Sequence, residues 1–98
     1  MVKEKEDICL KAVNKVLSAE FDPNSFSTKG SKESAACIDK KAQAWEVYGY
    51  ERGNKFQVSV FRNVVDACLE LIRRIGMNRN LDDLIDQFYS EIIGKSVA

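Results

Sequence analysis

Apolar residues recur three and four positions apart in the first part of the chain. This spacing places side chains on one face of a helix. The residues of this stripe are Cys9, Leu10, Val13, Val16, Leu17 and Phe21. Because Pro23 cannot continue a helical hydrogen-bond ladder, the pattern predicts a helix over residues 3–21.

Two further helices are predicted over residues 63–75 and 81–93. Each is preceded or begun by an asparagine, Asn63 or Asn80, whose short side chain can cap backbone N–H groups, and each is followed by a glycine. The apolar stripes are Val65, Cys68, Leu69, Ile72 and Ile75 in the first helix, and Leu81, Leu84, Ile85, Phe88 and Ile92 in the second.

Residues 34–61 contain three short apolar or alternating runs separated by polar turns. This pattern predicts three antiparallel strands in a meander, after a loop at residues 24–34. Successive side chains of a strand point to opposite faces. We expect Trp45, Val47, Phe56, Val58 and Val60 to face the helices, and Glu46, Tyr48, Tyr50, Gln57 and Ser59 to form a second, polar and aromatic face.

These elements predict an α+β fold with one N-terminal helix, a three-stranded antiparallel meander and two C-terminal helices packed on one face of the sheet. The chain has 98 residues, of which 45% are hydrophobic and 31% charged, which fits a single domain over residues 1–98. A chain of this length buries roughly 60 to 68% of its unfolded surface, which leaves little interior for a large cofactor.

Charge and residue types narrow the function classes. The 15 basic and 15 acidic side chains balance to zero, whereas domains that bind nucleic acid or anionic membranes usually carry a basic surplus. Histidine is absent, which removes the commonest general base and metal ligand. We therefore expect no enzyme activity, no cofactor and no metal, no direct contact with nucleic acid and no membrane span.

Cysteines Cys9, Cys37 and Cys68 each lie in an apolar stretch. They are odd in number and show no Cys-x-x-Cys spacing. We expect all three to be reduced and buried, as in a cytoplasmic protein.

Acidic residues are densest at the start of the last predicted helix. The helix dipole explains Asp82 and Asp83 in the first turn, but Asp86 lies beyond it. The aromatic residues concentrate in the sheet, where alternation keeps Trp45 and Tyr48 on opposite faces. One aromatic group is therefore expected at the surface, and exposed tyrosine is typical of protein-binding surfaces.

The helix, three-strand, helix order leaves a small RNA-binding domain open as an alternative. Double-stranded-RNA-binding domains share this order and hold phosphates with basic residues at the start of the helix after the sheet. Here that helix begins with Asn63, Val64, Val65 and Asp66, which includes an acid and no lysine.

Residues 44–75 contain a Trp-x-Val-Tyr strand from Trp45, a Glu-Arg-Gly turn from Glu51 and an Asp-Ala-Cys helix from Asp66. In this order they resemble small bacterial immunity proteins of polymorphic-toxin and contact-dependent growth inhibition systems. The resemblance covers about a third of the chain, and its motifs are structural.

The resemblance implies a cytoplasmic protein that binds the C-terminal domain of a cognate toxin, often a nuclease, and so protects the producing cell. Acidic side chains suit a basic nuclease, which makes Asp82, Asp83 and Asp86 the first candidate contacts with the toxin. Glu46, Tyr48 and Tyr50 form a second candidate surface. The identity of the toxin, the site that is blocked and the oligomeric state remain open at this point.

Overall fold

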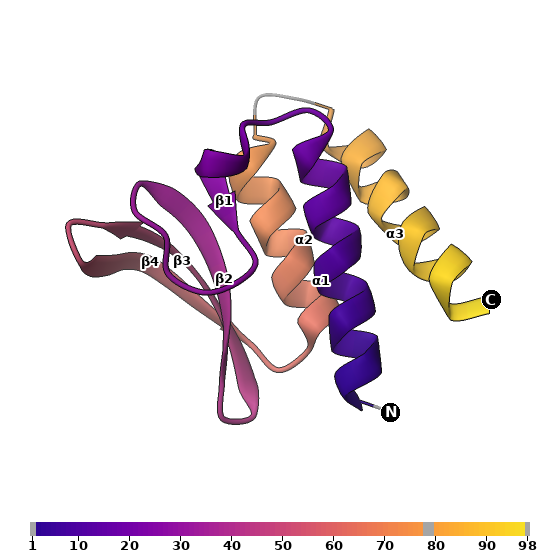
Figure 1. Cartoon of the computed structure of the whole chain (residues 1–98), viewed down its shortest axis with the longest axis horizontal. Helices are drawn as coiled ribbons and strands as arrows, with labels where there is room; N and C mark the ends of the chain where they lie inside the picture. Colours follow the sequence, from indigo (N-terminus) through magenta and orange to yellow (C-terminus); the bar gives the residue numbers. More distant parts are fainter. Residues whose placement is uncertain (1, 78–79, 98) are drawn as a thin grey trace.

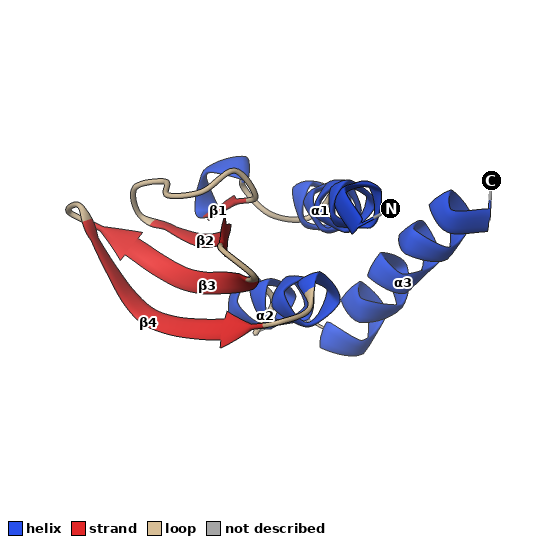
Figure 2. Ribbon diagram, turned by 90° about the horizontal axis from the view of Figure 1, so that it is seen from below, coloured by secondary structure: helices blue, strands red, loops and turns tan. Residues whose placement is uncertain are grey.

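The computed structural model describes residues 2–77 and 80–97, and it has three layers (Figures 1 and 2). A curved sheet forms the first layer. Helices α1 (Val2–Ser18) and α2 (Val64–Ile75) lie against it, and α3 (Leu81–Val97) packs on α1 and α2, on the side away from the sheet. The predicted α+β class and the order of the elements are confirmed.

The sheet has four strands in the order β1-β2-β3-β4. The meander consists of β2 (Ala35–Lys41), β3 (Ala44–Glu51) and β4 (Asn54–Phe61), which pair antiparallel as predicted. The turn between β3 and β4 has positive φ at both Arg52 and Gly53, the geometry of a tight two-residue hairpin.

The sequence predicts a loop over residues 24–34, but part of this segment has regular secondary structure. The carboxylate of Asp22 accepts a hydrogen bond of 2.8 Å from the backbone of Asn24 and caps a single 3-10 turn, η1 (Pro23–Ser25). The strand β1 (Phe26–Ser27) then pairs parallel with β2. The buried ring of Phe26 anchors this segment in the core, which brings its backbone alongside β2.

The helix positions are confirmed, with two differences at their ends. The first helix ends at Ser18, before the predicted Phe21, and Asp22 serves to cap the next turn. The last helix continues past Gly94 to Val97. Gly94 lacks the positive φ with which a glycine ends a helix, so the helical backbone runs through it.

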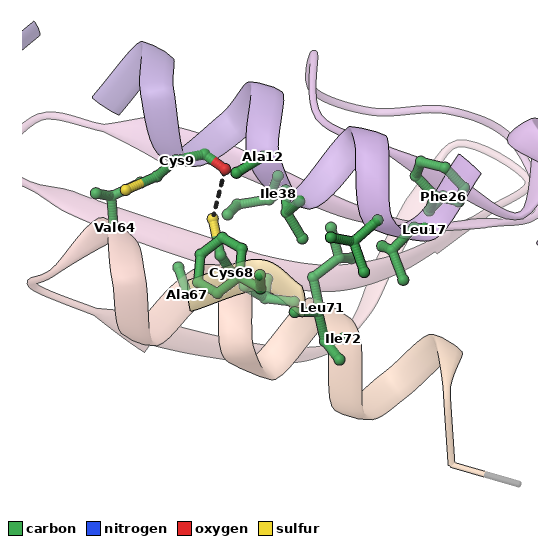
Figure 3. Packing of buried hydrophobic residues seen from close by; sticks show 14 of the residues in the cluster. Cys9, Ala12, Leu17, Phe26, Ile38, Val64, Ala67, Cys68, Leu71 and Ile72 are labelled. Atoms are coloured by element: carbon green, nitrogen blue, oxygen red, sulfur yellow. Dashed lines mark hydrogen bonds between the residues drawn. The ribbon is translucent and has the colours of Figure 1, made fainter. Parts of the chain in front are cut away.

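The main core lies where the sheet, α1, α2 and α3 meet, and part of it is drawn in Figure 3. Trp45 and Val47 face the helices in this core, as predicted. All three cysteines are fully buried and none is in a disulfide, which confirms their predicted burial. Burial raises the pKa of the Cys68 thiol, which donates a weak 3.8 Å hydrogen bond to the Cys9 carbonyl oxygen.

The prediction that Val58 and Val60 face the helices is wrong, whereas Phe56 faces the helix side without being buried. The exposed fractions of Phe56, Val58 and Val60 are 46%, 46% and 62%. Val47 pairs with Ser59 and Gly49 with Phe56, so β4 has one more residue than β3 between these two pairs. This is a β-bulge, and Gln57 has a φ of 50° within it.

The bulge changes which side chains of β4 share a face. Paired residues point to the same side of a sheet, so Ser59 lies on the helix side with Val47, and Val60 lies on the outer face with Glu46. Phe56 is on the helix side with Gly49, but at the end of the hairpin that projects beyond the helices (Figure 1). The predicted outer position of Ser59 is therefore also wrong.

Candidate functional site

The three aspartates at the start of α3 are all exposed, and Asp82, Asp83 and Asp86 together are called the α3 acidic surface below. The side-chain oxygen of Asn80 accepts a 3.2 Å hydrogen bond from the Asp83 backbone and caps the helix. The carboxylate of Asp83 also accepts a 2.9 Å hydrogen bond from Gln87.

No ion pair neutralises the α3 acidic surface within the described part of the chain. The next acid of the helix, Glu91, differs because it pairs with Lys15 of α1 at 3.1 Å. Asp86 borders a groove of about 310 Å³ between α1 and α3, which Lys15 and Glu91 also line. The field of the three aspartates is therefore directed into solvent, beside a shallow groove.

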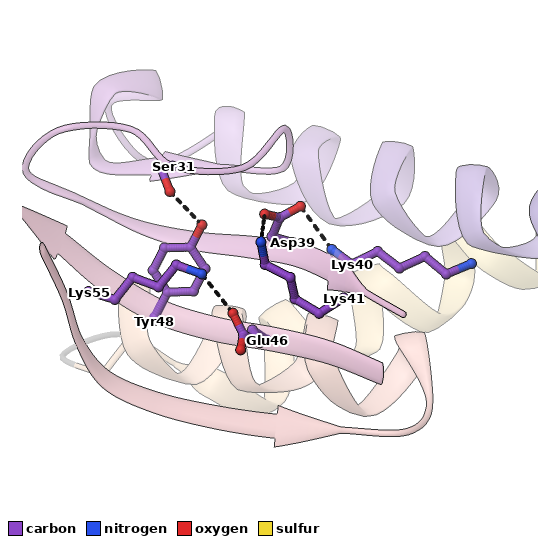
Figure 4. A network of polar contacts seen from close by, with 7 residues as sticks. All are labelled: Ser31, Asp39, Lys40, Lys41, Glu46, Tyr48 and Lys55. Atoms are coloured by element: carbon purple, nitrogen blue, oxygen red, sulfur yellow. Dashed lines mark hydrogen bonds and ion pairs between the residues drawn. The ribbon is translucent and has the colours of Figure 1, made fainter. Parts of the chain in front are cut away.

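The second candidate set lies on the outer face of the sheet, as Figure 4 shows for Glu46 and Tyr48. Tyr48 is fully buried there, because the loop at residues 28–34 folds over it. Its hydroxyl lies 2.8 Å from the Ser31 hydroxyl, and the Lys32 backbone donates a 3.3 Å hydrogen bond to the sulfur of Cys37. Tyr48 can contact a partner only if this loop moves.

Tyr48 instead forms a small second core on the outer face with Ala35 and Cys37. Burial raises the pKa of its phenol, and the hydrogen bond with Ser31 opposes that effect in part. Tyr50 is half-buried, and its ring meets that of Tyr48 edge-on at 6.5 Å between centroids. Of the two tyrosines proposed as contacts, only Tyr50 reaches the surface.

Glu46 is occupied by an ion pair with Lys55, 2.8 Å between Nζ and Oε1. The ammonium group of Lys55 also lies 4.6 Å from the centre of the Tyr48 ring. The hydrogen bond with Glu46 raises the pKa of Lys55. Because their charges offset each other, this pair offers a partner less net field than the α3 acidic surface does.

Sequence reasoning missed a cleft of about 800 Å³ between the β3–β4 hairpin and the C-terminal end of α2, called the hairpin–α2 cleft below. Gly49 and Ala36 form part of its floor, Phe56 contributes from the hairpin, and Arg73 and Met77 contribute from the helical side. The signal in the sequence is Gly49, a residue without a side chain inside a strand, which often marks the close approach of another group to the backbone.

Arg74 holds the cleft together by linking α2 to the bulge of β4. Its Nε donates a 2.9 Å hydrogen bond to Glu70, and its Nη2 donates one of 3.1 Å to the Ser59 hydroxyl and another to the Gln57 carbonyl oxygen. The positive φ of Gln57 is thus held in place by a side chain of α2.

Within residues 2–77 and 80–97, no group of three or more His, Cys, Asp or Glu side chains is arranged to hold a metal ion. Among the same residues, no helix is both long enough and apolar enough to cross a membrane. Comparisons with protein-family models, with curated proteins and with solved structures give no significant match.

Proposed function

We propose that this chain is an immunity protein that binds and neutralises a cognate bacterial toxin domain, a nuclease, in the cytoplasm of the producing cell. Binding is direct and stoichiometric, and it needs no catalysis and no cofactor. The observation that carries the proposal is the α3 acidic surface, whose three exposed aspartates have no ion-pair partner among the described residues.

A nuclease must present basic groups where it holds the phosphates of its substrate. Three carboxylates within five positions of one helix create a field that attracts such groups and speeds the encounter of the two proteins. The α3 acidic surface therefore has the charge that a nuclease inhibitor needs.

The resemblance to immunity proteins supports the same proposal from a different part of the chain. The stretch that carries it, residues 44–75, contains β3, β4 and α2. The α3 acidic surface lies outside this stretch, so its aspartates can change without disturbing the sheet.

The RNA-binding alternative gains no support from the helix that follows the sheet. Asn63 accepts a 2.7 Å hydrogen bond from the Val65 backbone and so caps the N-terminus of α2, where Asp66 lies exposed in the first turn. Phosphates would meet a carboxylate at this position, which is unfavourable.

The proposal predicts that the cognate toxin domain is encoded beside this gene, and co-expression with that domain tests it. The wild-type chain should restore growth and co-purify with the toxin domain. The double variant Asp83→Lys/Asp86→Lys should bind at least about tenfold more slowly at low salt. The charge-matched control Glu4→Lys/Asp7→Lys, at exposed positions of α1, should bind like the wild type. Failure of the wild type to bind the toxin domain would refute the proposal.

A further inference from the structure

The hairpin–α2 cleft is separate from the three aspartates of α3, none of which lines it. Its volume of about 800 Å³ lies within the range of ligand sites, roughly 300 to 1,000 Å³.

The shape of the cleft follows from small residues at its floor. Ala36 of β2 and Gly49 of β3 are paired neighbours on the helix side of the sheet. A methyl group at position 49 would lie 2.3 Å from the Phe56 ring, so only glycine lets the tip of this ring come so close to the strand. Phe56 remains 46% exposed and Met77, on the opposite side, 71% exposed, which gives the cleft two apolar walls.

The two arginines of the cleft differ in what they already bind. Arg74 is mostly buried, and its guanidinium is used by Glu70, Ser59 and the Gln57 carbonyl. The side chain of Arg73 is 52% exposed, and its closest acid, Glu70, is 3.7 Å away and shared with Arg74. Since the described residues offer Arg73 no hydrogen bond, its fork of donors is available to a carboxylate from outside.

We propose that the hairpin–α2 cleft receives a surface segment of the toxin domain, in which a large apolar side chain packs between Phe56 and Met77 and a neighbouring carboxylate pairs with Arg73. This inference rests on the proposed function and adds a second contact to the α3 acidic surface. A partner that presents both an acid here and basic groups to α3 is held in one orientation.

Two features favour a protein partner over a small molecule or a second copy of this chain. The apolar surface continues from the cleft around the edge strand through Val58 and Val60, beyond the reach of a small ligand. Glu46 neutralises Lys55, and the other charged side chains of residues 51–62 are two basic ones, Arg52 and Arg62, and one acid, Glu51. Two copies that met along β4 would therefore bring like charges together.

The test compares affinities for the purified toxin domain by titration calorimetry. Arg73→Glu should weaken binding about tenfold to hundredfold, and Arg73→Lys by less, because it keeps the charge and loses the fork. Arg62→Glu makes the same change of charge at an exposed position outside the cleft and should alter affinity less than about threefold. Phe56→Ser should weaken binding about tenfold, whereas Ile93→Ser, at a 60% exposed position on α3, should not.

Thermal unfolding of each variant establishes that it is folded, and sedimentation of the free chain reports self-association. An affinity unchanged in both Arg73→Glu and Phe56→Ser would overturn this inference and leave the proposed function standing. A wild-type dimer that Phe56→Ser dissociates would overturn it in favour of a second copy of the chain. If the wild type does not bind the toxin domain, both proposals fail.

Discussion

Replacing Arg74 with methionine should destabilise the fold because Arg74 joins α2 to the bulge of β4. The side chain is 18% exposed and makes three hydrogen bonds, one of them to the carboxylate of Glu70. A hydrogen bond to a charged group contributes about 1.5 to 3 kcal/mol when it is buried and about 1 kcal/mol when neutral. Methionine keeps most of the apolar stem, so packing is largely preserved.

Partial exposure to solvent and the flexibility of the Arg74 side chain reduce the combined contribution of its hydrogen bonds. We therefore expect Arg74→Met to lower the free energy of unfolding by about 1.5 to 3 kcal/mol. In a domain of this length that loss corresponds to a fall in Tm of about 6 to 24 °C. Urea denaturation followed by circular dichroism measures the difference, with the slope of the transition checked for constancy.

Arg73→Met is the matched control, one position earlier on the same helix. The Arg73 side chain is 52% exposed and its guanidinium lies 3.7 Å from Glu70, so removal of the guanidinium should cost less than about 0.5 kcal/mol. Equal stability of Arg74→Met and wild type would refute the assignment of Arg74 as the link to the bulge. Equal losses in both variants would show that Glu70, rather than the contact with β4, matters to the fold.

Two further predictions concern buried ionisable groups. Because burial raises the pKa of Tyr48 in the folded state, the stability that its neutral phenol provides is present below the unfolded pKa of about 10 and is lost as pH rises through the folded value. Tyr48→Phe should therefore flatten the fall in stability above about pH 10 in urea titrations, and an unchanged slope would contradict the burial of this hydroxyl. Burial also raises the pKa of Cys9, Cys37 and Cys68. All three thiols should therefore react with a thiol reagent only after unfolding. Rapid labelling of the native protein would contradict their burial.

The helices and the meander could be predicted from sequence because each depends on the pattern of residues within its own segment. The stripe from Cys9 to Leu17, the cap at Asn63 and the turn at Arg52–Gly53 each report the conformation of their own neighbourhood. The burial of the cysteines followed in the same way from the apolar stretches around them.

The faces of β4 could not be predicted because they depend on a single extra residue. Strict alternation over residues 56–60 places Val58 and Val60 in the core, and the bulge at Gln57 reverses that assignment. The bulge is fixed by Arg74, which lies 17 residues away along the chain, and no local pattern reports such a contact.

The candidate surfaces also differ in whether local sequence patterns or contacts between distant residues determine them. Exposure of the aspartates on α3 followed from the helical pattern, whereas the loop that covers Tyr48 is held by the contact between Ser31 and Tyr48, 17 residues apart in sequence. The hairpin–α2 cleft requires β2, β3, β4 and α2 together, so it becomes visible only in three dimensions.

The most direct test of the account is a titration of the proposed cognate toxin domain with the purified wild-type chain, read out both as heat of binding and as residual nuclease activity. The account predicts one chain per toxin domain, with activity lost in proportion to the chain added and abolished at equal molar amounts. Full nuclease activity in the presence of excess chain, with no heat of binding, would contradict it.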